Sequence, residues 1–250
     1  MYLNYIFDLY GTLIDIRTDE SSLNFWRKAV SVFARGRASY SPGELKQAYR
    51  RYVKAAVWRE RGRHPLWHNR DIDLLEVFAR LYAAKGVKAD DYLLLDTARR
   101  FRKASTERLC LYDGVKELLD ALKENGKRIY LLSNAQECFT IPELEEVGIF
   151  GYFDGILISS QERICKPQKR FFDTLIERYH LDRSQSIMIG NDNNSDMLGA
   201  KRAGIDGLYI HQEISPPVDS EDEIDAKYKI MDGDVHKIRE LILRPSEVTG

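Results

Sequence analysis

The fold of this 250-residue chain is indicated near its start by the stretch Tyr5-Ile6-Phe7-Asp8-Leu9-Tyr10-Gly11-Thr12-Leu13. A short apolar run ends abruptly at Asp8, and Gly11-Thr12 comes just beyond it. This pattern predicts a buried strand that delivers a carboxylate to a loop. A carboxylate in such a position is a candidate nucleophile, because it can form a covalent intermediate and divide a hydrolysis into two steps.

The next part of the chain, from about residue 18 to residue 107, has helical periodicity. Apolar residues recur at three-to-four spacing, and Ser41-Pro42 is a typical helix start with proline at the first helical position. We find no strand pattern of comparable strength here, so we expect an all-helical insert. The predicted helices cover residues 21–33, 42–58, 72–84 and 90–108.

After Asp113-Gly114 the pattern changes to short apolar runs that alternate with helical segments. Such alternation predicts a parallel sheet with helices on both faces. Residues 216–225 are acidic and contain proline, and they read as an exposed loop. The predicted strands cover residues 128–132, 155–158, 186–189, 207–210 and 227–231. The predicted helices cover 115–124, 143–147, 169–179, 195–203 and 235–243.

Polar side chains follow three of the predicted strands directly. Asp8 follows the first strand, Ser133-Asn134 follows the strand at 128–132, and Asp192 follows the strand at 186–189. The carboxyl ends of the strands in an open α/β sheet meet at one crevice, where ligands bind. We therefore expect these groups to lie together despite their distance in the sequence.

Composition restricts the possible functions. Hydrophobic residues make up 44% of the chain and charged residues 31%, which is typical of a globular protein. No apolar run reaches the roughly 18 residues of a membrane span, and the amino terminus lacks a signal-peptide pattern. The cysteines, Cys110, Cys138 and Cys165, are odd in number and lack metal-ligand spacing. We expect a reduced, cytoplasmic protein without a membrane partner; oligomeric state is not predicted.

The formal net charge is −1, but it is unevenly distributed. Residues 17–110 hold 15 Arg and 6 Lys against 11 acidic residues, so the remainder is acidic. A basic unit facing an acidic one can attract an anionic substrate, although arginines on solvated helix faces would give the same count. The chain as a whole is not basic and has no nucleic-acid motif, so we expect no nucleic-acid partner.

Four short motifs together resemble those of the haloacid dehalogenase superfamily. They are residues 7–13, Leu132-Ser133-Asn134, Lys166-Pro167, and Gly190-Asn191-Asp192 with Asp196. Each is weak alone, but their order and spacing match that superfamily over essentially the whole chain. The resemblance implies a Rossmann-like α/β core of residues 1–16 and 111–250. It also implies an inserted helical C1-type cap of residues 17–110.

The resemblance also implies roles for individual residues. Asp8 would be the nucleophile, and the turn at Gly11-Thr12 would offer backbone amides to an anion. Ser133 and Asn134 would hold phosphoryl oxygens, and Lys166 would offset negative charge. Helix caps or a surface lysine are the ordinary alternatives for the last three. The candidate catalytic residues are Asp8, Tyr10, Thr12, Ser133, Asn134 and Lys166.

A magnesium site is implied at the same place. Mg²⁺ prefers oxygen ligands and uses one or two carboxylates while it keeps several waters. By resemblance, the ligands are Asp8, the backbone carbonyl of Tyr10 and Asp192. Asp196 would bind through water or orient Lys166, and its ordinary alternative is an acid at a helix start.

One position departs from the pattern of the phosphatases in this superfamily. They carry a second Asp two positions after the nucleophile as general acid and base, whereas this chain has Tyr10. Haloacid dehalogenases carry tyrosine there and need no metal. However, Phe172 stands where they have a tyrosine six positions after the lysine, and Asp192 adds a carboxylate that a metal-free site would not favour.

We therefore expect a Mg²⁺-dependent phosphatase that acts on a small, anionic, phosphorylated metabolite through an aspartyl-phosphate intermediate. The alternatives are a metal-independent 2-haloacid dehalogenase and a non-catalytic binding protein of the same fold. The Arg-, His- and Trp-rich stretch of residues 58–70, where the helical pattern lapses, is either a loop that reads an anionic substrate or a solvated loop.

Overall fold

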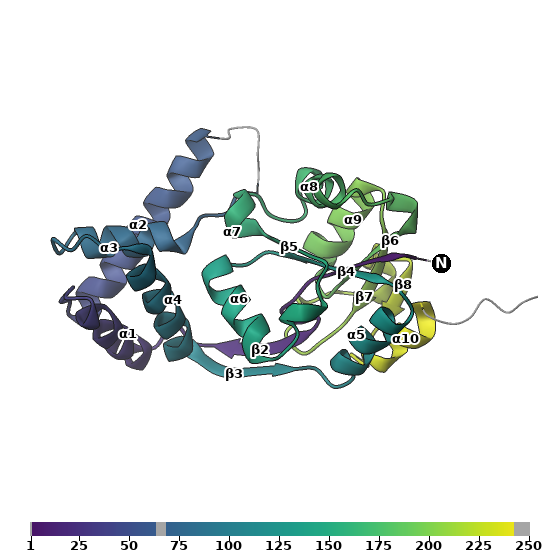
Figure 1. The fold of residues 1–250 in the computed structure, drawn as a ribbon, viewed down its shortest axis with the longest axis horizontal. Coiled ribbons are helices and arrows are strands. Elements are labelled where there is room, and N and C mark those ends of the chain that lie inside the picture. The colour runs from purple at the N-terminus through teal and green to yellow at the C-terminus, as the bar shows by residue number, and fades with distance from the viewer. Residues whose placement is uncertain (1, 64–68, 243–250) are drawn as a thin grey trace, which may run out of the picture.

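The computed structural model describes residues 2–63 and 69–242. Six parallel strands form one sheet in the order β5-β4-β1-β6-β7-β8. This confirms the predicted α/β, Rossmann-like class, and Figure 1 shows the sheet with helices on both sides. The strands are β1 (Asn4–Phe7), β4 (Arg128–Ser133), β5 (Gly155–Ile158), β6 (Ser186–Gly190), β7 (Asp206–Ile210) and β8 (Tyr228–Ile230).

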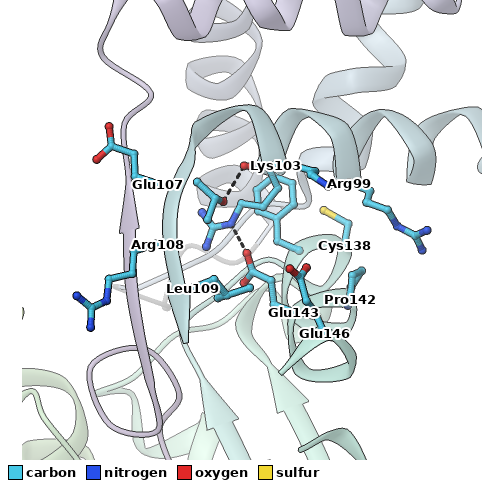
Figure 2. A pocket seen from close by; sticks show the side chains of 12 residues that line it. Arg99, Lys103, Glu107, Arg108, Leu109, Cys138, Pro142, Glu143 and Glu146 are labelled. Atoms are coloured by element: carbon cyan, nitrogen blue, oxygen red, sulfur yellow. Dashed lines mark hydrogen bonds and ion pairs between the residues drawn. The ribbon is translucent and has the colours of Figure 1, made fainter. Parts of the chain in front are cut away.

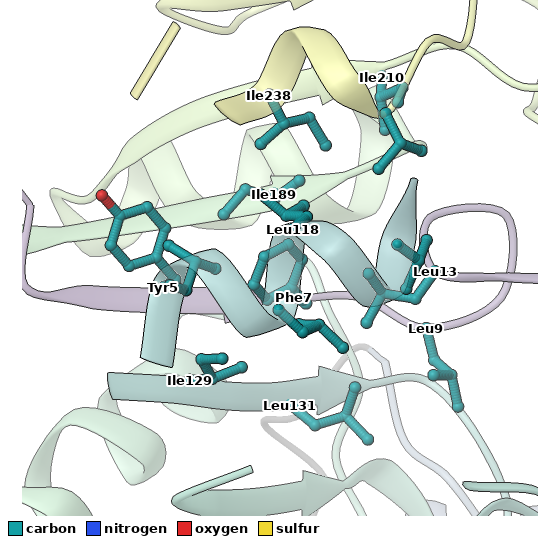
Figure 3. Close-up of a cluster of buried hydrophobic side chains, with 14 of the residues drawn as sticks. Tyr5, Phe7, Leu9, Leu13, Leu118, Ile129, Leu131, Ile189, Ile210 and Ile238 are labelled. Atoms are coloured by element: carbon teal, nitrogen blue, oxygen red, sulfur yellow. The ribbon is translucent and has the colours of Figure 1, made fainter. Parts of the chain in front are cut away.

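Apolar residues on the two faces of the sheet form two separate cores. Phe7 of β1 faces the core that α5 (Val115–Glu124) and α10 (His236–Ile242) cover, and Figure 3 shows it among Leu118, Ile129 and Ile189. Ile6, the preceding residue, faces the opposite core, which α8 (Lys169–Tyr179) and α9 (Leu198–Ala203) cover. Burial on both faces explains why these strands read as continuous apolar runs.

Residues 17–110 contribute four helices, which we call the helical unit. They are α1 (Leu23–Arg35), α2 (Pro42–Arg63), α3 (Leu74–Ala83) and α4 (Asp91–Ser105). The predicted start of α2 is a capping box, in which the Ser41 amide donates to Glu44 Oε2 (2.7 Å) and the Glu44 amide donates to Ser41 Oγ (3.3 Å). The proposed division into a core of 1–16 and 111–250 and a cap of 17–110 stays a prediction.

The helical unit has its own aromatic core. Phe101 is completely buried, and its ring centroid lies 4.9 Å from that of Phe25, 5.4 Å from Tyr49 and 5.1 Å from Phe78. Phe139 of α6 (Glu137–Glu146) belongs to the same cluster. The helical unit therefore packs on α6 through apolar side chains.

Replacing Phe101 with Ala should destabilise the helical unit. Loss of a buried aromatic side chain typically costs 3–5 kcal/mol, through lost burial and the cavity left behind. We expect the free energy of unfolding, measured by urea titration of tryptophan fluorescence, to fall by about 3–5 kcal/mol. Tyr92→Ala on the same helix is the control, because Tyr92 is 83% exposed. A loss of similar size in both variants would contradict the expectation.

The prediction that the insert is wholly helical is wrong at both of its ends. β2 (Ile14–Thr18) and β3 (Thr106–Leu111) form an antiparallel ribbon, which runs beneath α6 between the helical unit and the sheet in Figure 1. The helix predicted to reach residue 108 therefore ends at Ser105. Strand pairing between segments almost a hundred residues apart leaves no local periodicity, and β3 is polar at its start.

Three other predicted helices have different bounds. Helix α2, predicted to end at residue 58, continues to Arg63. Residues 58–63, where we expected the helical pattern to stop, are therefore helical, and residues 64–68 lie outside the described residues. The helix predicted at 143–147 begins at Glu137, although Pro142 lies inside it. The helix predicted at 195–203 starts as a π-turn, Asn193–Met197, before α9. No helix among the described residues is long and apolar enough to cross a membrane.

Candidate active site

The expected groups meet at the carboxyl ends of β1, β4 and β6. Asp8 directly follows β1, Ser133 is the last residue of β4, and Asp192 lies just beyond β6. They share one open cavity of about 220 Å³. Its lining residues are Asp8, Tyr10, Ser133, Asn134, Lys166, Asn191, Asp192, Ser195, Asp196, Ile214 and Pro216.

A buried lysine, which lies between two carboxylates, forms part of the cavity wall. Lys166 Nζ lies 2.6 Å from Asp8 Oδ1 and 2.7 Å from Asp196 Oδ1. Burial alone would lower the pKa of Lys166, but the charges of Asp196 and Asp8 outweigh burial and raise this pKa above its usual value. Lys166 is therefore a cation at neutral pH, and it fixes the position of the Asp8 carboxylate.

Asp196 is fully buried, and both of its oxygens are engaged. Oδ1 faces Lys166, and Oδ2 accepts a hydrogen bond of 3.0 Å from the Asp192 amide. Gly190 leaves room for this carboxylate, because a Cβ at that position would lie 2.3 Å from Asp196 Oδ2. Burial, together with the charge of Asp8, raises the pKa of Asp196, which Lys166 opposes. Asp196 thus anchors Lys166 and the loop after β6.

Asp192 has a different environment. Its Oδ1 accepts hydrogen bonds from the amides of Asn194 (2.8 Å) and Ser195 (3.2 Å) and so caps the π-turn. Its second carboxylate oxygen makes no hydrogen bond within the described residues, and the side chain lines the cavity that Asp8 also lines. Asp192 can therefore offer one oxygen to a cation.

The groups expected to hold a phosphoryl oxygen divide into two kinds. Ser133 Oγ is buried, and it has no hydrogen-bond partner among residues 2–63 and 69–242. A buried hydroxyl without a partner is costly, so it is available to a ligand. Asn134 instead accepts from the Lys166 amide (2.8 Å) and donates to the Lys166 carbonyl (3.2 Å). Asn134 therefore holds the lysine backbone.

The turn after the nucleophile depends on Gly11 and Thr12. Gly11 has a φ of +83°, and a Cβ there would lie 2.2 Å from Asn191 Nδ2. Only glycine fits this backbone conformation without strain. Thr12 is buried and donates to Asn191 Oδ1 at 3.4 Å. It joins the loops after β1 and β6 beneath the cavity and does not line it.

The side chain of Tyr10 is held away from any role as a base. Its hydroxyl donates to Glu143 Oε2 and lies 3.2 Å from Thr140 Oγ1. Glu143 is also paired with Arg102, whose Nε lies 2.6 Å from its Oε1. Burial, and then the charge of Glu143, raise the pKa of Tyr10 well above its usual value. A tyrosine of this kind cannot accept a proton at neutral pH.

The Arg102–Glu143 pair crosses from the helical unit to α6. Both side chains line a second cavity, of about 380 Å³, between α4, β3 and α6. Figure 2 shows Glu143 among the residues that line it. This pair was not predicted from the sequence, because Glu143 is one of several acidic residues on its helix and Arg102 is one of several basic residues on its own helix. Nothing in the local pattern distinguishes them.

The contribution of the loop after β7 to the cavity wall and the position of Phe172 were not predicted from the sequence. Ile214 and Pro216, in the loop after β7, form the apolar part of the cavity wall. Asn191 Nδ2 holds this loop through Ser215 Oγ at 3.2 Å. Phe172, which stands where dehalogenases have a tyrosine, is buried in the core beneath Gly199 and does not line the cavity.

Comparison with known proteins places the chain in a family. The model of the haloacid dehalogenase-like hydrolases matches residues 4–204. The HAD-hydrolase YfnB of Bacillus subtilis (strain 168) is 25% identical over 220 residues, which are 87% of each protein. Phosphoglycolate phosphatase of Agrobacterium fabrum (strain C58) is 30% identical over 211 residues, 82% of this chain and 78% of that protein.

Solved structures show the same fold. A magnesium-bound crystal structure of YfnB from Bacillus subtilis has a TM-score of 0.56 at 19% identity and covers 97% of this chain and 99% of that one. A dehalogenase with an intermediate complex has a TM-score of 0.59 at 19% identity and covers 98% of both chains. Fold alone does not separate phosphatase from dehalogenase. The chain belongs to the haloacid dehalogenase-like hydrolase family and is a hydrolase.

Proposed function

We propose that this chain is a Mg²⁺-dependent phosphatase that hydrolyses a small phosphorylated metabolite through an aspartyl-phosphate on Asp8. The observation that carries the proposal is the combination of groups around one cavity. Asp8 is held by Lys166 at 2.6 Å. The Ser133 hydroxyl, which has no hydrogen-bond partner in the described part of the chain, and Asp192 line the same cavity. The resemblance to a phosphoglycolate phosphatase over most of the chain supports the same reaction class.

The donor set fits a hard cation. Asp8, Asp192 and Asp196 carry three formal negative charges against the one positive charge of Lys166. No three His, Cys, Asp or Glu side chains converge as a metal cluster within the described residues, so protein carboxylates alone would not complete the site. Asp8, Asp192 and the Tyr10 carbonyl would hold Mg²⁺, which keeps waters and binds substrate oxygens. Bound Mg²⁺ would supply Lewis-acid charge to the phosphoryl oxygens.

The proposed reaction has two steps, transfer of the phosphoryl group to Asp8 and hydrolysis of the aspartyl-phosphate, and side chains of this cavity act in both. An oxygen of Asp8 attacks phosphorus while the bond to the alcohol oxygen breaks, and water later attacks the same phosphorus to release phosphate and restore Asp8. Lys166 offsets negative charge, and the Ser133 hydroxyl donates to a phosphoryl oxygen. Because the Tyr10 hydroxyl is engaged in a hydrogen bond to Glu143 and its pKa is raised, water must protonate a poor leaving group.

The test uses an aryl phosphate, whose good leaving group needs little protonation. We expect the purified protein to release phosphate with Mg²⁺ and to lose at least about 100-fold in rate with a chelator. Restoring Mg²⁺ should restore the rate. An equal rate with chelator would contradict the metal dependence. Binding of inorganic phosphate without turnover would instead support the non-catalytic reading.

A 2-haloacid dehalogenase is the second candidate, and Tyr10 is the observation that favours it. In that reaction Asp8 displaces halide from carbon and no acid is needed. Asp192 opposes it, because a metal-free site gains nothing from another carboxylate near Asp8. Halide release from 2-chloropropionate without metal, in the absence of phosphate release, would select this reading.

We also propose that the chain works as a core of residues 1–16 and 111–250 with a cap of residues 17–110. Separate apolar cores in the helical unit and on the two faces of the sheet support this division. The three free cysteines support a reducing compartment, which in our proposal is the cytoplasm.

A further inference from the structure

The segment of residues 69–74, which leads into α3, lies against the core rather than within the helical unit. We call it the linking segment. Its polar groups reach two loops that carry proposed site residues, the loop after β4 and the loop around Lys166. None of its residues lines the catalytic cavity. Its hydrogen bonds therefore act on the groups that surround the cavity.

Asn69 holds the backbone on both sides of Lys166. Its carbonyl accepts from the Cys165 amide at 3.1 Å and from Gln168 Nε2 at 3.1 Å. Its side-chain amide donates to the Lys166 carbonyl at 3.4 Å. Asn134 contacts that carbonyl from the core side, at 3.2 Å. The backbone of Lys166 is therefore held between a residue of the core and a residue from the 17–110 region.

Asp71 holds the loop after β4 from the same direction. Its Oδ2 accepts from Ser159 Oγ at 2.5 Å, and Ser159 Oγ in turn accepts from the Ala135 amide at 2.8 Å. Its Oδ1 faces Gln136 Nε2 at 3.2 Å. Ala135 and Gln136 follow directly after Ser133-Asn134. Burial raises the pKa of Asp71 in spite of these hydrogen bonds, so this carboxylate occupies a largely enclosed position.

Gln136 completes the connection. Its side-chain amide donates to the Ile72 carbonyl (2.9 Å) and accepts from the Leu74 amide (2.9 Å). The Asp71 amide also donates to the Arg163 carbonyl (3.3 Å), three residues before Lys166. The linking segment thus joins both loops through backbone and side-chain groups, and neither loop can move alone without breaking some of these bonds.

We propose that Asn69 and Asp71 are positioning residues, which fix Lys166 and the Ser133 loop relative to Asp8. The expected effect of these residues on the rate rests on the proposed function, whereas their effect on the position of the two loops does not. Its physical basis is that Lys166 Nζ must stay within ion-pair distance of Asp8 during reaction, and small displacements of a reacting group carry large losses in rate. The residues act through Lys166 and Ala135, and they contact no substrate.

The test compares Asn69→Ala and Asp71→Asn with two matched controls. Asn125→Ala removes an amide that donates to the Ala121 carbonyl at 2.8 Å, and Asp182→Asn alters a carboxylate that accepts from the Ser184 amide and hydroxyl, far from the cavity. We expect kcat for an aryl phosphate to fall on the order of tenfold in the two linking-segment variants, with KM changed less. Both controls should stay within about twofold.

Hydrogen exchange measured by mass spectrometry gives a readout that does not need turnover. We expect peptides covering residues 163–168 and 133–137 to exchange about tenfold faster in both linking-segment variants, while the melting temperature stays within a few degrees of the wild-type value. Unchanged exchange in these peptides would overturn the inference even if the wild type is an active phosphatase. A wild type without phosphate release would overturn the proposed function, and the exchange result would still decide the positioning role.

Discussion

Replacing Asp8 with Asn should abolish phosphate release, with a loss in rate of at least about 10⁴-fold, the scale seen when covalent enzymes lose their nucleophile. An amide oxygen is a far weaker nucleophile than a carboxylate oxygen and cannot form the acyl-phosphate. The measurement is aryl phosphate hydrolysis with Mg²⁺ at saturating substrate. Rapid-quench trapping of labelled phosphate on the wild type, and not on Asp8→Asn, would identify the intermediate directly.

The fold should survive this change, because Lys166 keeps its ion pair with Asp196 at 2.7 Å. The matched control is Asp15→Asn, which removes a carboxylate of β2 that pairs with Arg108 at 2.7 Å and lies outside the catalytic cavity. We expect Asp15→Asn to retain its rate within about twofold. An Asp8→Asn variant that still turns over the substrate would place the nucleophile elsewhere and contradict the proposed mechanism.

The sheet was predictable because its strands are buried on both faces. Residues 5–7 and 187–189 form unbroken apolar runs, and each ends at a polar or glycine-containing turn. Each such strand can be recognised from its own sequence, because burial of both faces requires apolar residues at consecutive positions. The convergence of Asp8, Ser133 and Asp192 follows from the topology of a parallel sheet and was predictable for the same reason.

The β2–β3 ribbon was not predictable in this way. Arg17, Arg108 and Glu107 occupy much of it, and only Ile14, Ile16 and two leucines provide an apolar face. Antiparallel pairing between these segments brings Ile16 opposite Leu109, and that contact exists only in the folded chain, because the whole helical unit lies between the two segments in the sequence. A local pattern carries no information about such a pair, so Thr106 and its neighbours read as the end of a helix.

The surroundings of Tyr10 show a similar limit at the level of the site. The sequence identifies an unusual residue at this position, and resemblance gives two explanations for it. It does not identify Glu143 and Arg102, which lie on α6 and α4 and meet Tyr10 only in the folded chain. Burial and the charge of Glu143 keep the proton on the Tyr10 hydroxyl, which donates to the Glu143 carboxylate, while Arg102 pairs with that carboxylate. These tertiary contacts make Tyr10 an even poorer base than an exposed tyrosine.

The role of Lys166 is open to a sharper test than simple deletion. Lys166→Met keeps most of the side-chain volume but removes the ammonium group between Asp8 and Asp196, which are both buried. Removing one partner of a buried ion pair typically costs 3–5 kcal/mol. We expect the free energy of unfolding at neutral pH to fall by about 3–5 kcal/mol, and the rate of phosphate release to fall by at least about 10²–10³-fold.

The double variant Lys166→Met with Asp196→Asn separates the two effects. Lys166→Met leaves two carboxylates without their cation, and Asp196→Asn neutralises the more deeply buried of the two. We therefore expect most of the lost stability to return. Activity should not return, because the Asp8 carboxylate and the transferring phosphoryl group still lack the ammonium that offsets their charge. Recovery of stability with activity still lost would make Lys166 a catalytic group as well as a structural one. Recovery of both stability and activity would mean that Lys166 serves only to compensate the charge of Asp196. A neutral pair of side chains at this place would then hold Asp8 equally well.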